Sequence, residues 1–303
     1  MPWPAIFTAM ITPFTPDGHL NLDIAARLAQ RLAHEGSDAL IIAGTTGESP
    51  TLTDPEREEL FHRVRQAVPH LPLWVGAGSN DTAHSRHLAR QAEQWGADGI
   101  LVVTPYYNKP PQEGLYRHFV EVAQNVNIPV MLYNVPGRTG VHLEADTAAR
   151  IHAASPNVVA IKEASGRLEA FHQLRAHAPQ LTLYTGDDSL LYPSLLLGAV
   201  GVVSVASHVV GPEMQALLRA ATSGRHSEAY QREQMLAPIF RDLFAWPNPI
   251  PVKWLLNQLG IDVGPLRPPL VYPSDTRGLE RLLAETLAVQ RQRSIRDVSA
   301  AEA

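Results

Sequence analysis

Residues 36–42 read Gly-Ser-Asp-Ala-Leu-Ile-Ile, and residues 96–102 repeat the pattern as Gly-Ala-Asp-Gly-Ile-Leu-Val. In each copy a glycine can end a helix, a short turn follows, and an apolar run then forms a buried strand. A third, looser copy, Gly-Ala-Val-Gly-Val-Val, occupies residues 198–203. The repeat predicts that strand–helix units recur along the chain.

Eight short apolar runs alternate with longer amphipathic segments, as expected for β-α-β units. Eight such units that close on themselves predict an α/β fold, the (β/α)8 TIM barrel; an open doubly wound sheet is the structural alternative. No Gly-x-Gly-x-x-Gly follows a strand, so the nucleotide-binding version of the open sheet loses its main support. The apolar runs are residues 5–11, 39–43, 73–76, 100–103, 130–133, 158–161, 181–184 and 201–205.

Helical patterns fill the segments between the runs. Residues 22–34 place Ile24, Leu28 and Leu32 on one stripe. Residues 54–68 follow Thr53, and either Thr53 or Asp54 can cap a helix there.

After about Gly224 the strand signals stop. We expect residues 1–224 to form the barrel and residues 225–303 to form a C-terminal helical region that prolines interrupt. The polar, alanine-rich residues 291–303 predict a frayed helix or a disordered tail.

Composition excludes several classes of function. A net charge of −5 without a basic patch argues against a nucleic-acid partner, because phosphate binding needs clustered Lys and Arg. With no cysteine in the chain, disulfides, thiolate metal sites and a cysteine nucleophile are ruled out. The first ten residues lack the features of a signal peptide, so we expect a cytoplasmic protein.

Residues 189–212 carry no Asp, Glu, Lys or Arg and are long enough to span a bilayer. Pro193, Gly198 and Gly201 interrupt the segment. A helix followed by a buried parallel strand, which is apolar on both faces, accounts for it better than a membrane span.

Lysine is scarce in this chain. Of 25 basic side chains only Lys109, Lys162 and Lys253 are lysine, so arginine supplies the routine surface charge. A lysine can lose its proton and attack a carbonyl, which arginine cannot do. Lys162 follows the sixth apolar run, at the end of the barrel where active sites lie, and partial burial there would favour the free amine. The structural alternative is a lysine that pairs with Glu163; we expect Lys109 and Lys253 to be structural.

Other polar groups follow strands at the same end of the barrel. Thr45 and Thr46 come after the second run and could hold a carboxylate or relay a proton. Tyr133 ends the fifth run, next to the strand of Lys162, and could shuttle protons. Arg138 could bind a carboxylate through two parallel hydrogen bonds. Each residue could alone be structural, but together they favour a site.

A metal site has weaker support. His84 and His87 lie one helical turn apart, but a third ligand with suitable spacing is missing from the sequence. Asp187 and Asp188 follow the seventh run, where they could bind a cation or cap a helix. We therefore expect no metal.

Six segments, in this order, resemble the dihydrodipicolinate synthase/N-acetylneuraminate lyase family. The resemblance covers about residues 6–287, nearly the whole chain. The last segment, Pro-Asn-Pro-Ile-Pro-Val-Lys, is typical of the synthase branch. The matching segments are residues 44–49, 104–108, 133–140, 161–164, 186–188 and 247–253.

The resemblance implies roles for individual residues. Lys162 matches the lysine that forms a Schiff base with pyruvate, and Tyr133 matches the proton donor and acceptor at the pyruvate carbonyl. Thr45 and Tyr107 match the rest of the proton relay. In the family a neighbouring subunit also sends a tyrosine into this region, here Tyr106 or Tyr107.

The remaining positions match groups that bind substrate. Thr46, beside Thr45, would contact the pyruvate carboxylate. Arg138 would receive the carboxylate of the second substrate, L-aspartate 4-semialdehyde. Gly186 and Val203 match positions that line the lysine, and many relatives carry isoleucine in place of Val203.

The implied reaction condenses pyruvate with aspartate semialdehyde to 4-hydroxy-tetrahydrodipicolinate, on the route to diaminopimelate and lysine. The protonated imine is the electron sink, so no cofactor is implied. Partners are small-molecule substrates, with neither nucleic acid nor membrane, and the family expectation is a homotetramer built from dimers.

One departure concerns regulation. Relatives that lysine inhibits carry histidines just after the motif at residues 44–49 and a glutamate in the helix after the third strand. Here Asp54, Arg57 and His84 hold these positions, although Asn80 and Tyr106 remain. We expect weak or absent inhibition by lysine.

Two other functions stay open. One is a sibling pyruvate lyase that acts on N-acetylneuraminate or a 2-keto-3-deoxy sugar acid; Thr45 and Arg138 favour the synthase instead. The other is a barrel that senses a keto acid without turning it over, against which the set of Lys162, Tyr133 and Thr45 argues.

Overall fold

Eight parallel strands close into a barrel, each paired with the next and β8 paired with β1, where Val203 lies opposite Phe7. The TIM barrel predicted from the apolar runs is therefore confirmed, and the open sheet is wrong. The structure, a computed structural model, describes residues 3–301, with side chains described as far as residue 293. The strands are β1 (Ile6–Ala9), β2 (Ala39–Ile42), β3 (Leu73–Gly76), β4 (Gly99–Val103), β5 (Val130–Asn134), β6 (Val158–Glu163), β7 (Thr182–Thr185) and β8 (Gly201–Ser204).

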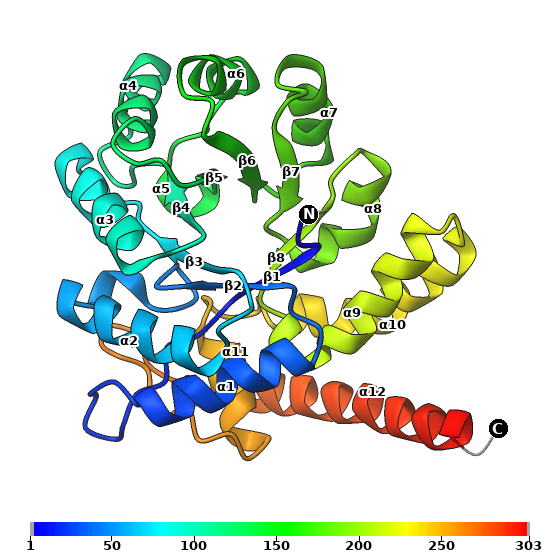
Figure 1. Cartoon of the computed structure of the whole chain (residues 1–303). Helices are drawn as coiled ribbons and strands as arrows, with labels where there is room; N and C mark the ends of the chain where they lie inside the picture. Colours follow the sequence, from blue (N-terminus) through cyan, green and yellow to red (C-terminus); the bar gives the residue numbers. More distant parts are fainter. Residues whose placement is uncertain (1–2, 302–303) are drawn as a thin grey trace.

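Helices surround the barrel, as Figure 1 shows in a view along its axis. Two short 3-10 helices, η1 (Ser49–Thr51) and η2 (Asp188–Leu190), and the short α5 (Pro136–Thr139) lie in loops after strands. The other helices up to residue 222 are α1 (Leu22–His34), α2 (Asp54–Ala67), α3 (Thr82–Trp95), α4 (Gln112–Ala123), α6 (Ala145–Ala154), α7 (Leu168–His177), α8 (Leu191–Leu196) and α9 (Ser207–Thr222).

Local sequence sets where α1 and α2 begin. The Asn21 side chain accepts a hydrogen bond from the Ile24 amide at the start of α1. Thr53 caps α2 and forms a reciprocal capping box with Glu56, and Pro55 sits in the first turn. Thr53, rather than Asp54, is therefore the cap.

Large side chains fill the interior of the barrel. Phe7 packs edge-on against Trp74 and Tyr184, with ring centroids 5.4 and 5.3 Å apart. The Tyr184 hydroxyl donates to the Pro4 carbonyl, which satisfies its only polar group. The interior of the barrel is thus a packed core and not a pore.

The uncharged segment at residues 189–212 forms α8, β8 and most of the first half of α9. The interpretation as a helix followed by a buried strand is confirmed. Across the described residues, no helix has the length and apolar character needed to cross a membrane.

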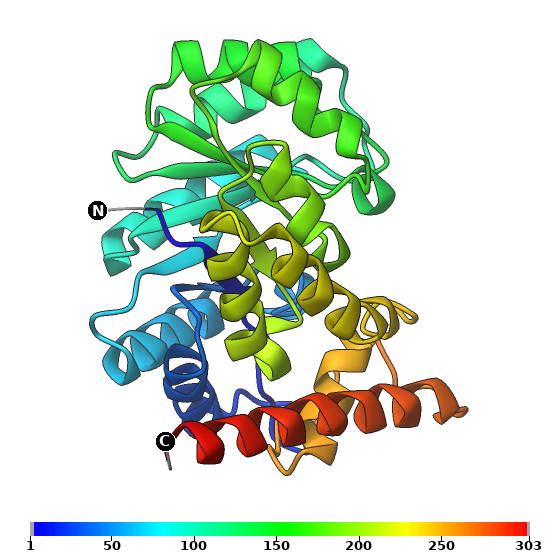
Figure 2. The same ribbon diagram turned by 90° about the vertical axis from the view of Figure 1, so that its right-hand side faces the viewer.

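The C-terminal region consists of α10 (His226–Asp242), α11 (Ile250–Gln258) and α12 (Arg277–Ala301). α12 packs against α10 and α11, and in Figure 2 it runs along the bottom of the view. Most of the predicted frayed or disordered tail continues α12 as far as Ala301, and residues 302–303 lie outside the described residues. The division into two domains near residue 224 stays a prediction.

We predict that Gly201→Ala destabilises the barrel where β8 meets β1. An added Cβ would lie 1.9 Å from the Ala5 carbonyl oxygen, which belongs to the backbone and cannot turn away. We expect a loss of about 3 kcal/mol in the free energy of unfolding, measured by urea denaturation. Gly278→Ala is the control, because a Cβ there meets open space and should change stability by less than about 1 kcal/mol. Equal unfolding midpoints for the two variants would show that the close approach of β8 to Ala5 does not limit stability.

Candidate active site

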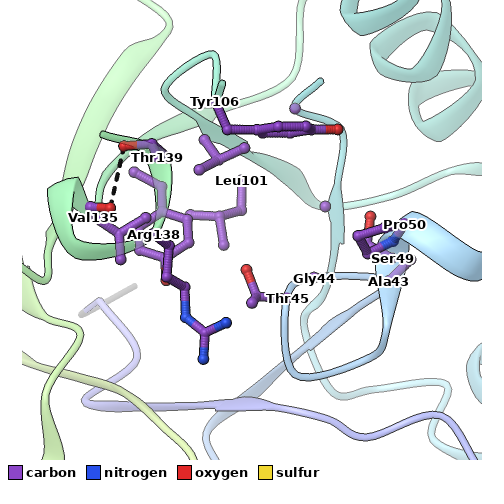
Figure 3. Close-up of a pocket in the computed structure, with 14 residues that line it drawn as sticks. Ala43, Gly44, Thr45, Ser49, Pro50, Leu101, Tyr106, Val135, Arg138 and Thr139 are labelled. Atoms are coloured by element: carbon purple, nitrogen blue, oxygen red, sulfur yellow. Dashed lines mark hydrogen bonds between the residues drawn. The ribbon is translucent and has the colours of Figure 1, made fainter. Parts of the chain in front are cut away.

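A cavity of about 200 Å³ opens at the carboxyl ends of the strands. Its walls come from β3, β4 and β5 and from the loops after β2, β3, β4 and β5, so residues far apart in sequence meet there (Figure 3). The lining residues are Ala43, Gly44, Thr45, Ser49, Pro50, Gly76, Gly78, Leu101, Val103, Tyr106, Tyr133, Val135, Arg138 and Thr139.

Lys162 lies near the end of β6, opposite Tyr133 of β5 and Tyr184 of β7 in the parallel register. Its side chain is 6% exposed, and Nζ lies 4.1 Å from the centroid of the Tyr133 ring. Lys162 itself is not among the lining residues; its amine reaches the cavity wall at the ring of Tyr133. The structure thus brings the predicted amine and the predicted proton carrier into contact.

Gly186 leaves room for the lysine. A Cβ at this position would lie 2.7 Å from Lys162 Cε and 2.6 Å from the Ala164 methyl group. A side chain here would therefore displace the amine. The next residue, Asp187, is close enough for the Lys162 charge to favour its ionised form, but burial dominates and raises the pKa of Asp187.

Glu163 does not pair with Lys162, so the structural alternative for this lysine is wrong. The Glu163 carboxylate accepts hydrogen bonds from Asn134 Nδ2 at 2.8 Å and from the Ser165 amide at 2.7 Å. Asn134 in turn accepts from the Leu143 amide. This buried network joins the ends of β5 and β6, one residue beyond Tyr133 and Lys162, and fixes the two strand ends relative to each other.

The paired threonines have different surroundings. Thr45 lines the cavity, and in Figure 3 it lies across from Arg138. Thr46 is buried, and its hydroxyl oxygen accepts a hydrogen bond from Asn248 Nδ2 at 2.9 Å. Its own proton thereby remains available to an acceptor such as a carboxylate.

Arg138 lies in α5 and lines the cavity. Its Nη2 donates to the Asn248 carbonyl at 3.3 Å. Asn248 therefore contacts both Thr46 and Arg138, the two residues expected to bind substrate carboxylates.

The two tyrosines after β4 lie in different surroundings. Tyr106 lines the cavity, whereas Tyr107 is 89% exposed and has a backbone φ of +74°. A large residue adopts this conformation only when its surroundings require it. In the single chain, Tyr107 does not lie with Lys162 and Tyr133. Val203, in contrast, is fully buried in the barrel interior, in one cluster with Tyr133 and Tyr184.

Asp188, one of the two acidic residues after β7, has a structural role. Its Oδ2 accepts hydrogen bonds from the Val205 and Ala206 amides, just before α9, so it anchors the loop after β8. In the described part of the chain, no three His, Asp or Glu side chains are grouped so that they could hold a metal ion.

Asn134, Glu163 and Asn248 were not predicted as parts of the site. The first two could have been found, because each follows a candidate residue on neighbouring strands and must point to the opposite face. Asn248 lies 110 residues from Arg138 along the chain, and only the fold brings them together.

Comparisons with known proteins point to one family. The model of the dihydrodipicolinate synthetase family matches residues 3–285. A protein of Cyanothece sp. called 4-hydroxy-tetrahydrodipicolinate synthase is 51% identical over 286 residues, covering 93% of this chain and 97% of that protein. The protein of the same name from Bacillus subtilis is 48% identical and covers 88% of this chain and 92% of the relative.

Solved structures give the same result. The crystal structure of DHDPS from Cyanidioschyzon merolae with lysine bound superposes with a TM-score of 0.90 at 43% identity, covering 94% of this chain and 97% of that one. The 4-hydroxy-tetrahydrodipicolinate synthase of Methylacidiphilum fumariolicum has a TM-score of 0.92 at 40% identity and covers 95% and 97%. The prediction from the six sequence segments is confirmed: the chain belongs to the dihydrodipicolinate synthetase family.

Proposed function

We propose that this chain condenses pyruvate with L-aspartate 4-semialdehyde to 4-hydroxy-tetrahydrodipicolinate through a Schiff base on Lys162. The observation that carries the proposal is the buried Lys162 amine against the ring of Tyr133, beside a cavity at the carboxyl end of the barrel. The shared name of the relatives supports the reaction, a lyase reaction that commits carbon to diaminopimelate and lysine.

The chemistry requires one amine and a proton carrier. The Lys162 nitrogen attacks the ketone of pyruvate, water leaves, and the resulting iminium loses a methyl proton to give an enamine. The enamine carbon attacks the aldehyde of the second substrate, whose amino group then displaces Lys162 as the ring closes. Because the protonated imine accepts the electron pair that the methyl carbon retains when it loses its proton, the reaction needs no cofactor.

The other residues have roles in proton transfer and binding. Tyr133 donates and accepts protons at the pyruvate carbonyl, with Thr45 and Tyr107 completing the relay. Thr45 and Thr46 bind the pyruvate carboxylate, and Arg138 binds the carboxylate of the semialdehyde with two parallel hydrogen bonds. Gly186 and Val203 shape the space around Lys162.

The exposure of Tyr107 supports an assembly in which this residue enters the site of a neighbouring subunit. A strained backbone that exposes a large aromatic ring is unfavourable unless a partner covers the ring. We propose a homotetramer formed from two dimers, in the cytoplasm, with small molecules as the other partners and without nucleic acid or membrane. One similar structure is described as a monomeric variant, so the assembly has its own test, the mass in solution.

A reduction experiment tests the Schiff base. Incubation with pyruvate and borohydride should add a reduced three-carbon group to one peptide, the one that contains Lys162, as read by mass spectrometry. Lys162→Arg keeps the charge but cannot form the imine, and should show no adduct. If the folded wild type forms no adduct, the keto-acid sensor becomes the better reading. An adduct without condensation of aspartate semialdehyde, but with cleavage of a sugar acid, would favour the sibling lyase.

Tyr133→Phe tests the proton carrier. Removal of the hydroxyl should lower kcat by about 100-fold or more, because general acid–base catalysis contributes factors of this size. The ring remains, so the contact with Lys162 and the fold should persist. Tyr116→Phe is the matched control: that ring packs against Arg150 on the outer helices, and its loss of a hydroxyl should leave kcat within about twofold. Equal kcat values for both variants would remove Tyr133 from the mechanism.

We also predict that lysine below about 1 mM leaves the condensation rate unchanged. Arg57, where inhibited relatives carry a histidine, is buried and binds the Gly76 and Ser49 carbonyls, so it adds a positive charge beside Ser49 and Tyr106. His84, in place of the glutamate, contacts Asp54 and presents no carboxylate to an amine. The measurement is the rate at fixed substrates against lysine concentration, and half-inhibition at sub-millimolar lysine would show the prediction wrong.

A further inference from the structure

Lys253, in α11, is fully buried although it lies outside the reacting groups. Its ammonium makes three hydrogen bonds, to the Thr12 carbonyl at 3.0 Å, to Glu48 Oε1 at 2.8 Å and to the Pro265 carbonyl at 2.6 Å. An ammonium group has three donors, so each has an acceptor. Lys253 is therefore fixed in place by its bonds.

Glu48, its partner, belongs to the loop that carries the paired threonines. The carboxylate is almost fully buried, and its second oxygen accepts a hydrogen bond from the Arg267 amide at 2.9 Å. The Glu48 backbone has a φ of +55°, in the left-handed region that a residue with a side chain adopts only at a cost. Two anchors from the C-terminal region thus hold a strained residue.

Overall stability alone does not account for this pair. Burial lowers the pKa of Lys253 to about 8, while Glu48 acts in the opposite direction. The loss of hydration on burying two charges offsets much of their attraction, and apolar residues of equal size often stabilise a protein as well or better. A buried pair at this place therefore indicates that the geometry of Glu48 matters.

The geometry of Glu48 controls the carboxylate-binding loop. Its amide donates to the Thr45 carbonyl at 3.1 Å, and the next amide, that of Ser49, donates to the Gly44 carbonyl at 3.2 Å. On the other side, the Thr12 hydroxyl donates to the Gly47 carbonyl. A displacement of the Glu48 backbone would therefore disturb its hydrogen bond to the Thr45 carbonyl.

The same C-terminal segment also holds the other threonine. Asn248, five residues before Lys253, donates to the Thr46 hydroxyl. The segment at residues 248–253 therefore has one contact with Thr46 and one with the end of the loop at Glu48.

We infer that Lys253 is a positioning residue for pyruvate binding: it holds Glu48 so that the loop at residues 44–49 presents Thr45 and Thr46 to the substrate carboxylate. This inference rests on the proposed function. It predicts that Lys253 affects the affinity for pyruvate, because the loop presents both carboxylate-binding threonines. Lys162 and Tyr133 lie on β6 and β5, away from this loop, so only the Thr45 part of the proposed proton relay should be disturbed.

The kinetic test uses full-length variants at saturating aspartate semialdehyde. Lys253→Met should raise the KM for pyruvate by about tenfold or more, because misplaced binding groups weaken capture of the substrate. It should also lower kcat, though by less than Tyr133→Phe does, because Thr45 belongs to the proposed proton relay as well. The double variant Glu48→Gln/Lys253→Met leaves no unpaired charge and should regain thermal stability, yet it should keep the raised KM. A KM that returns to the wild-type value in the double variant would reduce Lys253 to a purely structural role.

Arg281→Gln provides the matched control. Arg281 joins α12 to Asp242 of α10 by two hydrogen bonds, in the same C-terminal region but without a contact to the loop. This variant should leave the KM for pyruvate unchanged, and a rise equal to that of Lys253→Met would overturn the inference.

Hydrogen exchange, followed by mass spectrometry, tests the positioning without any substrate. In Lys253→Met the added exchange should be concentrated in peptides that cover residues 44–52, where the loop amides are hydrogen-bonded, and in the segment at residues 265–267 that Lys253 and Glu48 contact. Exchange that rises evenly across the barrel, or does not change in the loop, would reject the inference. If the wild type forms no pyruvate adduct, the proposed function fails, while the exchange result still decides whether Lys253 holds the loop.

Discussion

The pairing of β8 with β1 is the constraint on which the site depends. Because the sheet closes, the carboxyl ends of all eight strands meet in one ring, and the register alone puts Tyr133 beside Lys162 and Lys162 beside Tyr184. Neighbouring strands lie about 4.8 Å apart, so the lysine amine meets the tyrosine ring without help from a loop. A shift of β6 by one residue would turn Lys162 into the helix layer and Ile161 into the barrel.

Much of the fold could be predicted from the sequence because its signals are local. Apolar runs, helix caps and glycines after helices each report on a few neighbouring residues, and the eight strands match the eight runs within about two residues. The place of Lys162 near the end of a strand could be predicted as well, since a scarce residue type that follows an apolar run is visible in the sequence. The contact between Lys162 and Tyr133 then followed from the order of the strands.

The rest of the site depends on contacts between distant parts of the chain. Nothing near Asn248 in the sequence indicates that its side chain meets Thr46 or that its carbonyl meets Arg138. Tyr107 illustrates another limit: its place after β4 was predicted, but its side chain points to solvent in the single chain. The contacts of Asn248 also join the predicted barrel, residues 1–224, to the predicted helical region, so the site needs both parts.

The two buried lysines, Lys162 and Lys253, have the same side chain in different surroundings. Lys253 was predicted to be structural, and its nitrogen is enclosed by three acceptors, so its lone pair cannot reach a carbonyl carbon. For Lys162, the described part of the chain supplies an aromatic face and no hydrogen-bond acceptor, so no bond to the protein holds its nitrogen. Arginine suits neither position: its planar fork does not match three acceptors around one atom, and it cannot give up its proton at neutral pH. Both positions therefore call for a single nitrogen: at Lys253 it is fixed by its bonds, and at Lys162, under the proposed function, it is free to react.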